Sequence, residues 1–334
     1  MPWTFATLTI ASALLVGSAY AAGPVFTDPT QVDEDFSVQG EYAGSVPIDG
    51  SEFPIGVQLI ARGDGRFDAV AYPGGLPGAG WSGGDSFSGS GKRDSDGVVA
   101  IEIVDANGVT RSAEIRGGEL AVLGPEGQEI IRLPKTVRES PTLGKAPPVG
   151  ARVIFDGAGP IDEAETLKNA RFSDDGLLMV GTVTAEDYGG AEWHLEFLLP
   201  YQPHDSKQHR GNSGAYVAGC YEIQILDSFG GEGKSDECGG LYGAAAPLVN
   251  MCLPPLVWQT YDIDFTAATF EKDRKVTNAR MTVRHNGTMI HENVDVPAMT
   301  PGGPRKTEGP AGPLFLQDHG NPVRFRNIWV KPKM

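Results

Sequence analysis

Basic residues are scarce in this chain. The sequence contains 27 Lys and Arg residues against 43 Asp and Glu, which gives a formal net charge of −16 at pH 7. Proteins that bind nucleic acid or an anionic membrane surface neutralise phosphate groups with an excess of basic side chains. The charge balance therefore excludes both classes of partner and favours a ligand that is neutral or cationic.

Long apolar runs are absent after the first 22 residues. Residues 4–20 form an apolar, uncharged run, and Ala19-Tyr20-Ala21 has the small-x-small pattern of a signal cleavage site. No later segment has the ~18 consecutive apolar residues of a membrane-spanning helix. We expect residues 1–22 to be a signal peptide and the mature protein to be exported, with no membrane span. No Lys or Arg precedes the run, so an uncleaved N-terminal anchor is the alternative.

Cysteine is also rare, with Cys220, Cys238 and Cys252 as the only three. No CxxC spacing and no nearby His supports a metal cluster. In an oxidising compartment one pair of these residues can close a loop and leave one thiol over. We expect a disulfide between Cys238 and Cys252, which flank a Gly-rich loop, whereas Cys220 precedes an alternating strand.

Helical periodicity is missing, while Gly (45) and Pro (25) are abundant. This combination predicts many short strands and turns, and 334 residues suggest two domains. In the first half, residues 36–42 alternate, and residues 55–60 run into the turn Gly63-Asp64-Gly65 before a returning strand at 67–72. We therefore expect a small antiparallel β domain within residues 23–140, whose role the sequence does not indicate.

A Pro-rich segment at residues 141–148 predicts a linker. In residues 149–334 the alternation becomes longer: Trp193, Leu195 and Phe197 share one face of a strand, and Asn286-Gly287 marks a hairpin. Strands separated by turns, with hardly a helix, favour an all-β fold in which the second domain is a jelly-roll β-sandwich. One sheet face would remain polar and free to bind a ligand.

Two polar clusters lie in this second half. Glu222 and Gln224 share one face of the segment Tyr221–Asp227, and Asp227 ends it. The other cluster, residues 316–327, carries Gln, Asp, His and Asn in a loop before the last strand. Loops on a rigid sheet are where binding groups concentrate.

The order of several short motifs resembles the 3-keto-disaccharide hydrolase domain family over roughly residues 149–331. The motifs are Gly211-Asn212-Ser213-Gly214, Tyr221–Asp227, Leu241-Tyr242-Gly243, Trp258–Tyr261, His285-Asn286-Gly287, Leu316–Gly320 and Val323–Ile328. The resemblance implies a concanavalin-like jelly roll that acts on glycosides oxidised to a ketone at C3.

The implied reaction assigns roles to these positions. A ketone at C3 acidifies the proton on C2, so the site needs a base, a group that stabilises the enolate oxygen, and donors for sugar hydroxyls. Either Glu222 or His319 is the candidate base, and a divalent cation is a candidate beside the oxyanion. The candidate catalytic residues are Glu222, Asp227 and His319, and the candidate substrate-binding residues are Asn212, Gln224, Tyr242, Gln317, Arg324 and Arg326.

Two other functions are compatible with the same residues. The spacing Glu222-x-Gln224-x-x-Asp227 is similar to the catalytic strand of laminarinase-like retaining hydrolases, which pair two carboxylates. That mechanism would need a β-bulge between Glu222 and Asp227. A non-catalytic carbohydrate-binding module is the other alternative, with Trp81 and Trp258 as stacking platforms.

Overall fold

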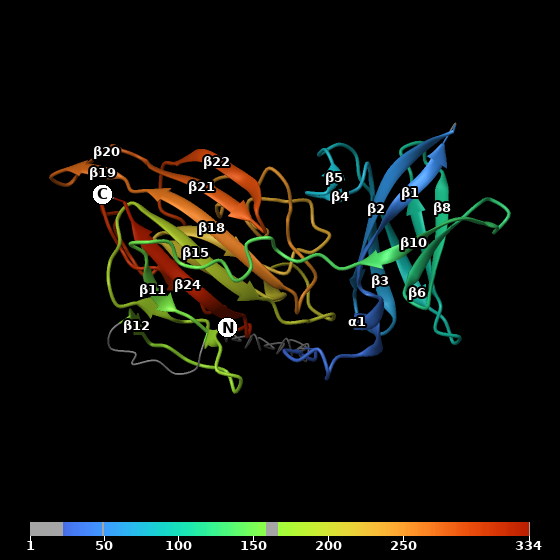
Figure 1. Cartoon of the computed structure of the whole chain (residues 1–334), viewed down its shortest axis with the longest axis horizontal. Coiled ribbons are helices and arrows are strands. Elements are labelled where there is room, and N and C mark those ends of the chain that lie inside the picture. The colour runs from blue at the N-terminus through green and yellow to red at the C-terminus, as the bar shows by residue number, and fades with distance from the viewer. Residues whose placement is uncertain (1–22, 49, 158–165, 334) are drawn as a thin grey trace, which may run out of the picture.

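The computed structural model describes residues 23–48, 50–157 and 166–333. The expected signal peptide lies outside the described residues. Within them, no helix is long and apolar enough to cross a bilayer. The prediction of an almost all-β protein is confirmed. Figure 1 shows a β-barrel and a β-sandwich lying side by side along the long axis of the molecule.

The first domain is a closed, eight-stranded antiparallel barrel with strand order β1-β10-β9-β8-β7-β6-β3-β2. The turn predicted at Gly63–Gly65 joins β2 to β3, and a turn at Asn107-Gly108 joins β7 to β8. The elements are α1 (Glu34–Val38), β1 (Gly40–Ile48), β2 (Ser51–Ala61), β3 (Arg66–Pro73), β4 (Leu76–Pro77), β5 (Gly80–Trp81), β6 (Phe87–Arg93), β7 (Val99–Val104), β8 (Thr110–Arg116), β9 (Glu119–Leu123) and β10 (Glu129–Thr136).

The first predicted strand differs from the structure at its start. Residues 34–38 are helical, and β1 begins only at Gly40. The Asp33 side chain accepts a hydrogen bond from the backbone N–H of Phe36 (3.2 Å), which caps the helix. Phe36 and Val38 of this short helix pack against the inner residues of the barrel. The cap and this packing outweigh the alternating pattern of the segment.

The second domain is a sandwich of two antiparallel sheets. The seven-stranded sheet has the order β11-β24-β15-β18-β21-β22, with β13 paired to β24, and the five-stranded sheet has the order β12-β14-β23-β16-β17. The elements are β11 (Arg152–Phe155), β12 (Leu167–Lys168), β13 (Leu178–Met179), β14 (Val183–Thr184), β15 (Ala191–Leu198), η1 (Lys207–His209), β16 (Ser213–Val217), β17 (Tyr221–Ile225), β18 (Trp258–Thr266), β19 (Thr269–Glu271), β20 (Arg274–Thr277), β21 (Ala279–His285), β22 (Thr288–Val296), β23 (Phe315–Leu316) and β24 (Arg324–Pro332).

The core of the sandwich follows the predicted alternation. Trp193, Leu195 and Phe197 of β15 are buried in one cluster with Ile223 and Ile225 of β17. Their neighbours along each strand point to the opposite faces. The polar face of β17, which carries Glu222 and Gln224, therefore lies on the side of the five-stranded sheet away from the core.

The predicted linker is held on the seven-stranded sheet. Ser140 Oγ lies 2.6 Å from Thr260 Oγ1, and the backbone N–H of Gly144 donates to Glu196 Oε1 at 2.5 Å. Lys145 Nζ forms an ion pair with Asp262 (2.7 Å). These contacts bury the polar face of β15 and β18 and fix the path of the chain between the two domains.

The expected disulfide is absent: Cys220, Cys238 and Cys252 are free, buried thiols. Cys238 Sγ lies 3.3 Å from the Tyr261 hydroxyl, and Cys252 Sγ faces the backbone oxygen of Leu226 (3.5 Å). The Gly-rich loop is instead held by hydrogen bonds, because Asn250 Nδ2 donates to the backbone oxygen of Ser228 (2.8 Å). The Cys238 and Cys252 side chains nevertheless interact with each other as thiols, so the structure brings the predicted pair together without the covalent bond.

Barrel and sandwich meet through a buried ion pair. Arg210 Nε donates to Asp227 Oδ2 at 2.6 Å, and both side chains are 1% exposed. The same guanidinium donates to the backbone oxygen of Ala61 (3.1 Å) and to Gln39 Oε1 (3.3 Å) in the barrel. Asp227 is thus a structural residue at the domain interface.

We expect Asp227→Asn to lower the free energy of unfolding by about 3–5 kcal/mol, because the change leaves the buried Arg210 charge without its partner. Asp175→Asn is the control, since Asp175 pairs with Arg324 at the surface and is 54% exposed; its effect should stay below ~1 kcal/mol. Urea unfolding measures both. Equal stability of the Asp227→Asn variant and the wild-type protein would contradict this account.

Candidate functional site

A polar pocket of about 190 Å³ opens on the outer face of the five-stranded sheet. Residues from β16, β17, η1 and four loops converge on it. Six of the nine site residues predicted from the sequence line it. The lining consists of Gln208, Asn212, Tyr216, Glu222, Gln224, Tyr242, Pro301, Gly302, Gln317 and His319.

The floor of the pocket is the hairpin of β16 and β17. Tyr216 pairs with Glu222, and Gly214 pairs with Gln224, so these side chains share one face. A Cβ at Gly214 would lie 2.2 Å from Glu222 Oε1. Only glycine therefore leaves room for the Glu222 carboxyl to fold over β16.

Glu222 is the buried carboxyl of the pocket, with 3% of its surface exposed. Burial raises its pKa from 4.5 to about 7, although the hydrogen bond with Tyr216 acts in the opposite direction. A carboxyl with this pKa holds and releases a proton near neutral pH, as a general acid or base must.

The hydrogen bonds of Tyr216 link it to the protonation of Glu222. The Tyr216 hydroxyl oxygen lies 2.7 Å from Glu222 Oε2 and 2.5 Å from the backbone oxygen of Pro301, and Gln317 Nε2 donates to it at 3.2 Å. A tyrosine hydroxyl has one proton and a carbonyl has none. The hydroxyl can therefore donate to only one of these two acceptors at a time, and its bond to Glu222 favours the ionised carboxyl.

Amide side chains form the other wall. Asn212 Nδ2 donates to the backbone oxygen (2.7 Å) and to Oε1 (3.1 Å) of Gln208, and Gln224 Nε2 donates to the same Oε1 (3.1 Å). Asn212 Oδ1 is buried and has no hydrogen-bond partner among the residues that the structure describes. Buried acceptors of this kind are normally satisfied, so a ligand hydroxyl would fit here.

His319 and Tyr242 stand nearer to the solvent. His319 is exposed, in the loop after β23, and Tyr242 is half-buried in the loop after β17. Asp318, beside His319, forms an ion pair with Arg171 (2.5 Å). The pocket thus has a carboxyl at its floor and an imidazole at its mouth.

Three predicted site residues lie outside this pocket. Asp227 is held in the ion pair with Arg210 described above. Arg324 and Arg326 are on β24, which belongs to the seven-stranded sheet. Arg326 donates to Glu196 (2.7 Å), and its guanidinium lies 4.0 Å over the Trp258 ring. The roles expected for these three residues are corrected, because they face other parts of the molecule.

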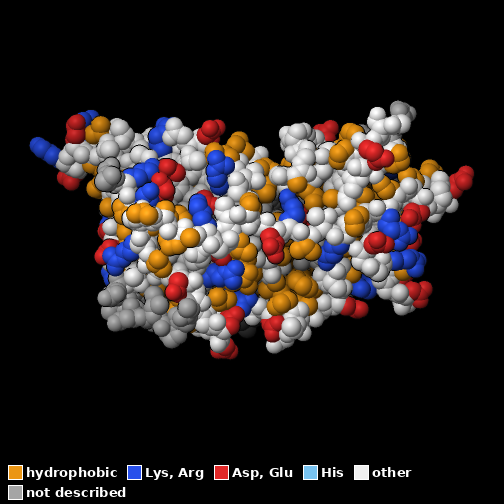
Figure 2. Space-filling model, in the orientation of Figure 1, with side chains coloured by type: hydrophobic (Ala, Val, Ile, Leu, Met, Phe, Trp, Pro, Cys, Tyr) orange, Lys and Arg blue, Asp and Glu red, His pale blue; other side chains and the backbone are white. Residues whose placement is uncertain are grey.

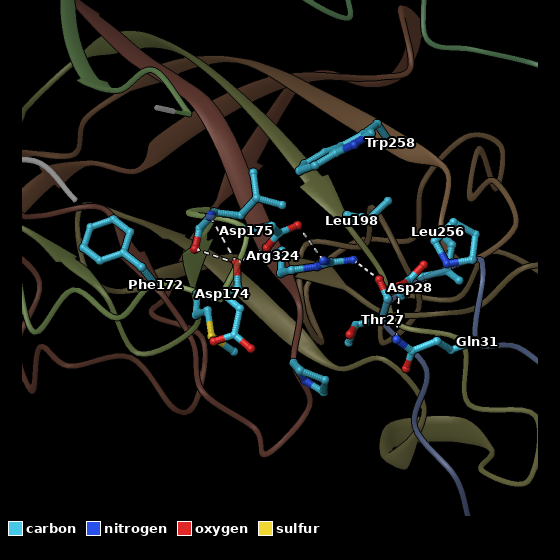
Figure 3. A pocket seen from close by; sticks show the side chains of 15 residues that line it. Thr27, Asp28, Gln31, Phe172, Asp174, Asp175, Leu198, Leu256, Trp258 and Arg324 are labelled. Carbon is cyan, nitrogen blue, oxygen red and sulfur yellow. Dashed lines mark hydrogen bonds and ion pairs between the residues drawn. The ribbon is translucent and has the colours of Figure 1, made fainter. Parts of the chain in front are cut away.

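Arg324 lines a second, larger cleft of about 760 Å³ between residues 27–31 and the seven-stranded sheet. Figure 3 shows its guanidinium between Asp175 and Thr27, with the Trp258 ring across the cleft. It pairs with Asp175 (3.0 Å) and donates to the backbone oxygen of Thr27. Arg324 therefore ties the N-terminal segment to the sandwich, and this cleft holds no buried carboxyl like Glu222.

The pocket has few side chains that could bind a metal ion. Among the described residues, no group of three or more His, Cys, Asp and Glu side chains could hold an ion. The pocket offers one carboxyl, Glu222, and one imidazole, His319, whereas catalytic metal sites commonly use three protein ligands. The residues present do not fit the divalent cation considered above.

Some pocket residues escaped the sequence analysis. Gln208 comes from η1, and Pro301 and Gly302 come from a loop; neither segment carries a local signal of its position. The position of Tyr216 was visible in the sequence, because Tyr216 lies two residues after Gly214 and therefore shares its face of the strand.

Comparison with known proteins identifies the sandwich. Residues 150–331 match the family model of a 3-keto-alpha-glucoside-1,2-lyase-like domain, which confirms the resemblance drawn from the motifs. Two structures of candidate glycosyl hydrolases from Parabacteroides distasonis are similar. One is 29% identical, covers 55% of this chain and 84% of its own, and has a TM-score of 0.49. The other is 18% identical, covers 55% and 94%, and has a TM-score of 0.39. No curated protein matches the sequence.

The Glu222 pKa gives a prediction that needs no substrate. We expect ¹³C NMR of the side-chain carboxyls to show one Glu that titrates near pH 7 and is missing in Glu222→Gln. Tyr216→Phe should raise this pKa further, because the hydrogen bond that lowers it is lost. Tyr221→Phe is the control, since its hydroxyl faces Glu308. A Glu222 pKa near 4.5 would refute this description of the site.

The same shift affects stability. The folded protein keeps the Glu222 proton between pH 4.5 and about 7, whereas the unfolded chain releases it. The free energy of unfolding of the wild-type protein should therefore fall relative to that of Glu222→Gln as the pH rises through this window.

Proposed function

We propose, because the chain belongs to the family of 3-keto-alpha-glucoside-1,2-lyase-like domains, that it cleaves glycosides that carry a ketone at C3. Family membership supports an activity on glycosidic bonds and a carbohydrate substrate. The observation that carries the finer proposal is a single buried carboxyl, Glu222, with a pKa of about 7 in a pocket of amides and hydroxyls.

The chemistry of a 3-keto sugar requires one well-placed base. The ionised Glu222 removes the proton on C2, and the electron pair passes into the enolate of the C3 ketone. This pair then forms the C1–C2 double bond while the bond from C1 to the leaving oxygen breaks. Water then adds: its hydroxyl binds C1 and its remaining proton goes to the leaving oxygen, while C2 takes the proton held by Glu222, so the sum is hydrolysis of the glycoside. Glu222 returns the proton it took and is regenerated.

The other residues of the pocket bind and orient the substrate. The side-chain N–H groups of Gln224 and Gln317 can donate to the enolate oxygen and to sugar hydroxyls, and Asn212 Oδ1 can accept from a hydroxyl. His319, at the exposed mouth, can donate a hydrogen bond to the leaving oxygen. Tyr216 holds the Glu222 carboxyl in position.

The size of the pocket limits what enters it. Its volume of about 190 Å³ is below the ~300–1,000 Å³ of sites for drug-sized ligands. We infer that one keto-sugar ring occupies the floor and that the leaving group extends past His319 towards the solvent.

A laminarinase-like mechanism has less support. It needs two carboxylates about 5–5.5 Å apart across the scissile bond. Glu222 is the one carboxylate among the lining residues, and Asp227 is paired with Arg210 elsewhere. A binding module would need an exposed aromatic ring on which a sugar can stack. The Trp258 ring is covered by the Arg326 guanidinium, which weakens this alternative.

We expect Glu222→Gln to lower turnover of a 3-keto disaccharide by about 10²–10⁴-fold, since that is the usual contribution of a general base. In the wild-type protein kcat/KM should rise with pH to a plateau above pH 7, because only the ionised form of Glu222 accepts the proton. Glu292→Gln, an exposed carboxylate on β22, is the matched control and should leave the rate unchanged. The rate of release of reducing sugar measures the activity of the wild-type protein and the two variants, with and without a chelator.

Other outcomes separate the alternatives. Cleavage of unmodified β-glucan that is abolished by Asp227→Asn, in a variant that still folds, would support the retaining mechanism. Binding of glycans with no cleavage of 3-keto or ordinary glycosides would support a binding module. Full activity of Glu222→Gln would refute the role of this residue.

We further propose that the protein is exported, with cleavage near Ala21 or Ala22, on the basis of the apolar N-terminal run. The intact mass of protein recovered from the exported fraction should lack the first 21 or 22 residues. A mass that still includes Met1 or Pro2 would support the uncleaved anchor instead.

A further inference from the structure

The barrel encloses a cavity that is separate from the sugar pocket. Its volume is about 750 Å³, which falls within the ~300–1,000 Å³ of sites for drug-sized ligands. The cavity occupies one half of the barrel interior. Its lining includes Val46, Phe53, Ile55, Val57, Ala71 and Ile101, together with further side chains of β7 to β10.

The two ends of the barrel differ in side-chain size. At the end beside the sandwich, Tyr42, Leu59 and Phe67 fill the interior, and Tyr201 of the sandwich packs into the same cluster. The Tyr201 hydroxyl donates to Asp33 at 2.9 Å, just before α1. This end is therefore plugged. Small inward residues such as Ala71 and Ala113 leave the space open in the other half.

Polar groups are confined to one strand and its turn. Asp105, Thr110, Arg111 and Ser112 belong to the β7–β8 hairpin, and Arg111 forms an ion pair with Asp105 at 2.8 Å. The charges compensate each other, so the cavity presents no net charge to a ligand. All other lining residues are apolar apart from Gly124.

The mouth of the cavity exposes apolar side chains to the solvent. Phe53 is 46% exposed, Val109 46% and Ile130 48%, and each comes from a different hairpin. Figure 2 shows hydrophobic side chains at the surface over the barrel. Exposed apolar groups that surround an apolar cavity are typical of a ligand entrance.

The width of the barrel decides the class of ligand. The interior of an eight-stranded barrel holds its own side chains or one small molecule, whereas an α-helix with its side chains is ~10–12 Å across. A helical protein segment is therefore too wide. We propose that the barrel binds an uncharged, apolar small molecule, an aliphatic or aromatic compound, which enters between the β1–β2, β7–β8 and β9–β10 hairpins.

The test uses the uncharged fluorescent probe N-phenyl-1-naphthylamine on the full chain. Wild-type protein should bind one probe molecule with a rise in fluorescence. Ala113→Phe, which fills the cavity, should weaken binding by about tenfold or more, or about 1.4 kcal/mol, because its ring occupies the space that the probe needs. Ala100→Phe is the matched control. Ala100 lies on β7 and pairs with Glu114, the residue after Ala113 on β8, but its side chain is exposed on the outside of the barrel.

A second variant and a second measurement guard against misfolding. Ala71→Phe blocks the cavity from β3 and should also weaken binding. Methyl NMR of the wild-type protein should show probe-induced shifts at Ile101, Ile103 and Val122, with no shift at Ile263 or Val283 in the sandwich. The proposal is overturned by an absence of binding to wild-type protein, by equal affinity of the folded cavity variants and Ala100→Phe, or by shifts confined to the sandwich.

Discussion

The buried ion pair between Arg210 and Asp227 holds this molecule together at the point where its parts meet. Arg210 precedes β16 and Asp227 follows β17, so the pair closes the open end of the hairpin that forms the pocket floor. The backbone N–H of Asp227 also donates to the oxygen of Arg210 (3.2 Å). Burying two charges is costly unless further hydrogen bonds satisfy them, and Ala61 and Gln39 of the barrel supply these.

Burial has a different consequence for Glu222, five residues earlier. This carboxyl has no cationic partner among the causes of its shift, and its pKa rises to about 7. The same hairpin thus carries one carboxylate compensated by an arginine and one that exchanges a proton near neutrality. Their separation explains why a single carboxyl, rather than a pair, faces the sugar pocket, and this favours abstraction of a proton next to a ketone over displacement by a second carboxylate.

The two domains contain cavities of opposite character. The pocket of the sandwich is small and lined by amides, hydroxyls and one carboxyl, whereas the barrel cavity is larger and almost wholly apolar. The ion pair and the plug formed by Tyr201 lie between them. The two proposed ligands would therefore occupy separate domains of one chain.

Local patterns in the sequence determined the faces of the strands. Alternation placed Glu222 and Gln224 together on the polar side of β17 and Trp193 in the core, and the turn residues located the hairpins. Such features depend on neighbours two to four residues apart, so a sequence displays them directly. The family motifs added the loop with Gln317 and His319, which lies far from β17 along the chain.

Tertiary structure decided which faces meet. The barrel closes because β1 pairs with β10, with Tyr42 opposite Lys135, and nothing local to either strand indicates this partner. The spacing of Asp227 from Glu222 is similar to that of a catalytic pair of carboxylates. However, β17 ends at Ile225, and the Asp227 side chain forms an ion pair with Arg210. Arg324 and Arg326 adjoin the pocket loop in sequence, but β24 pairs within the opposite sheet. These outcomes depend on pairings between distant segments, whose energy is set by packing and burial in the folded chain and not by the local sequence pattern.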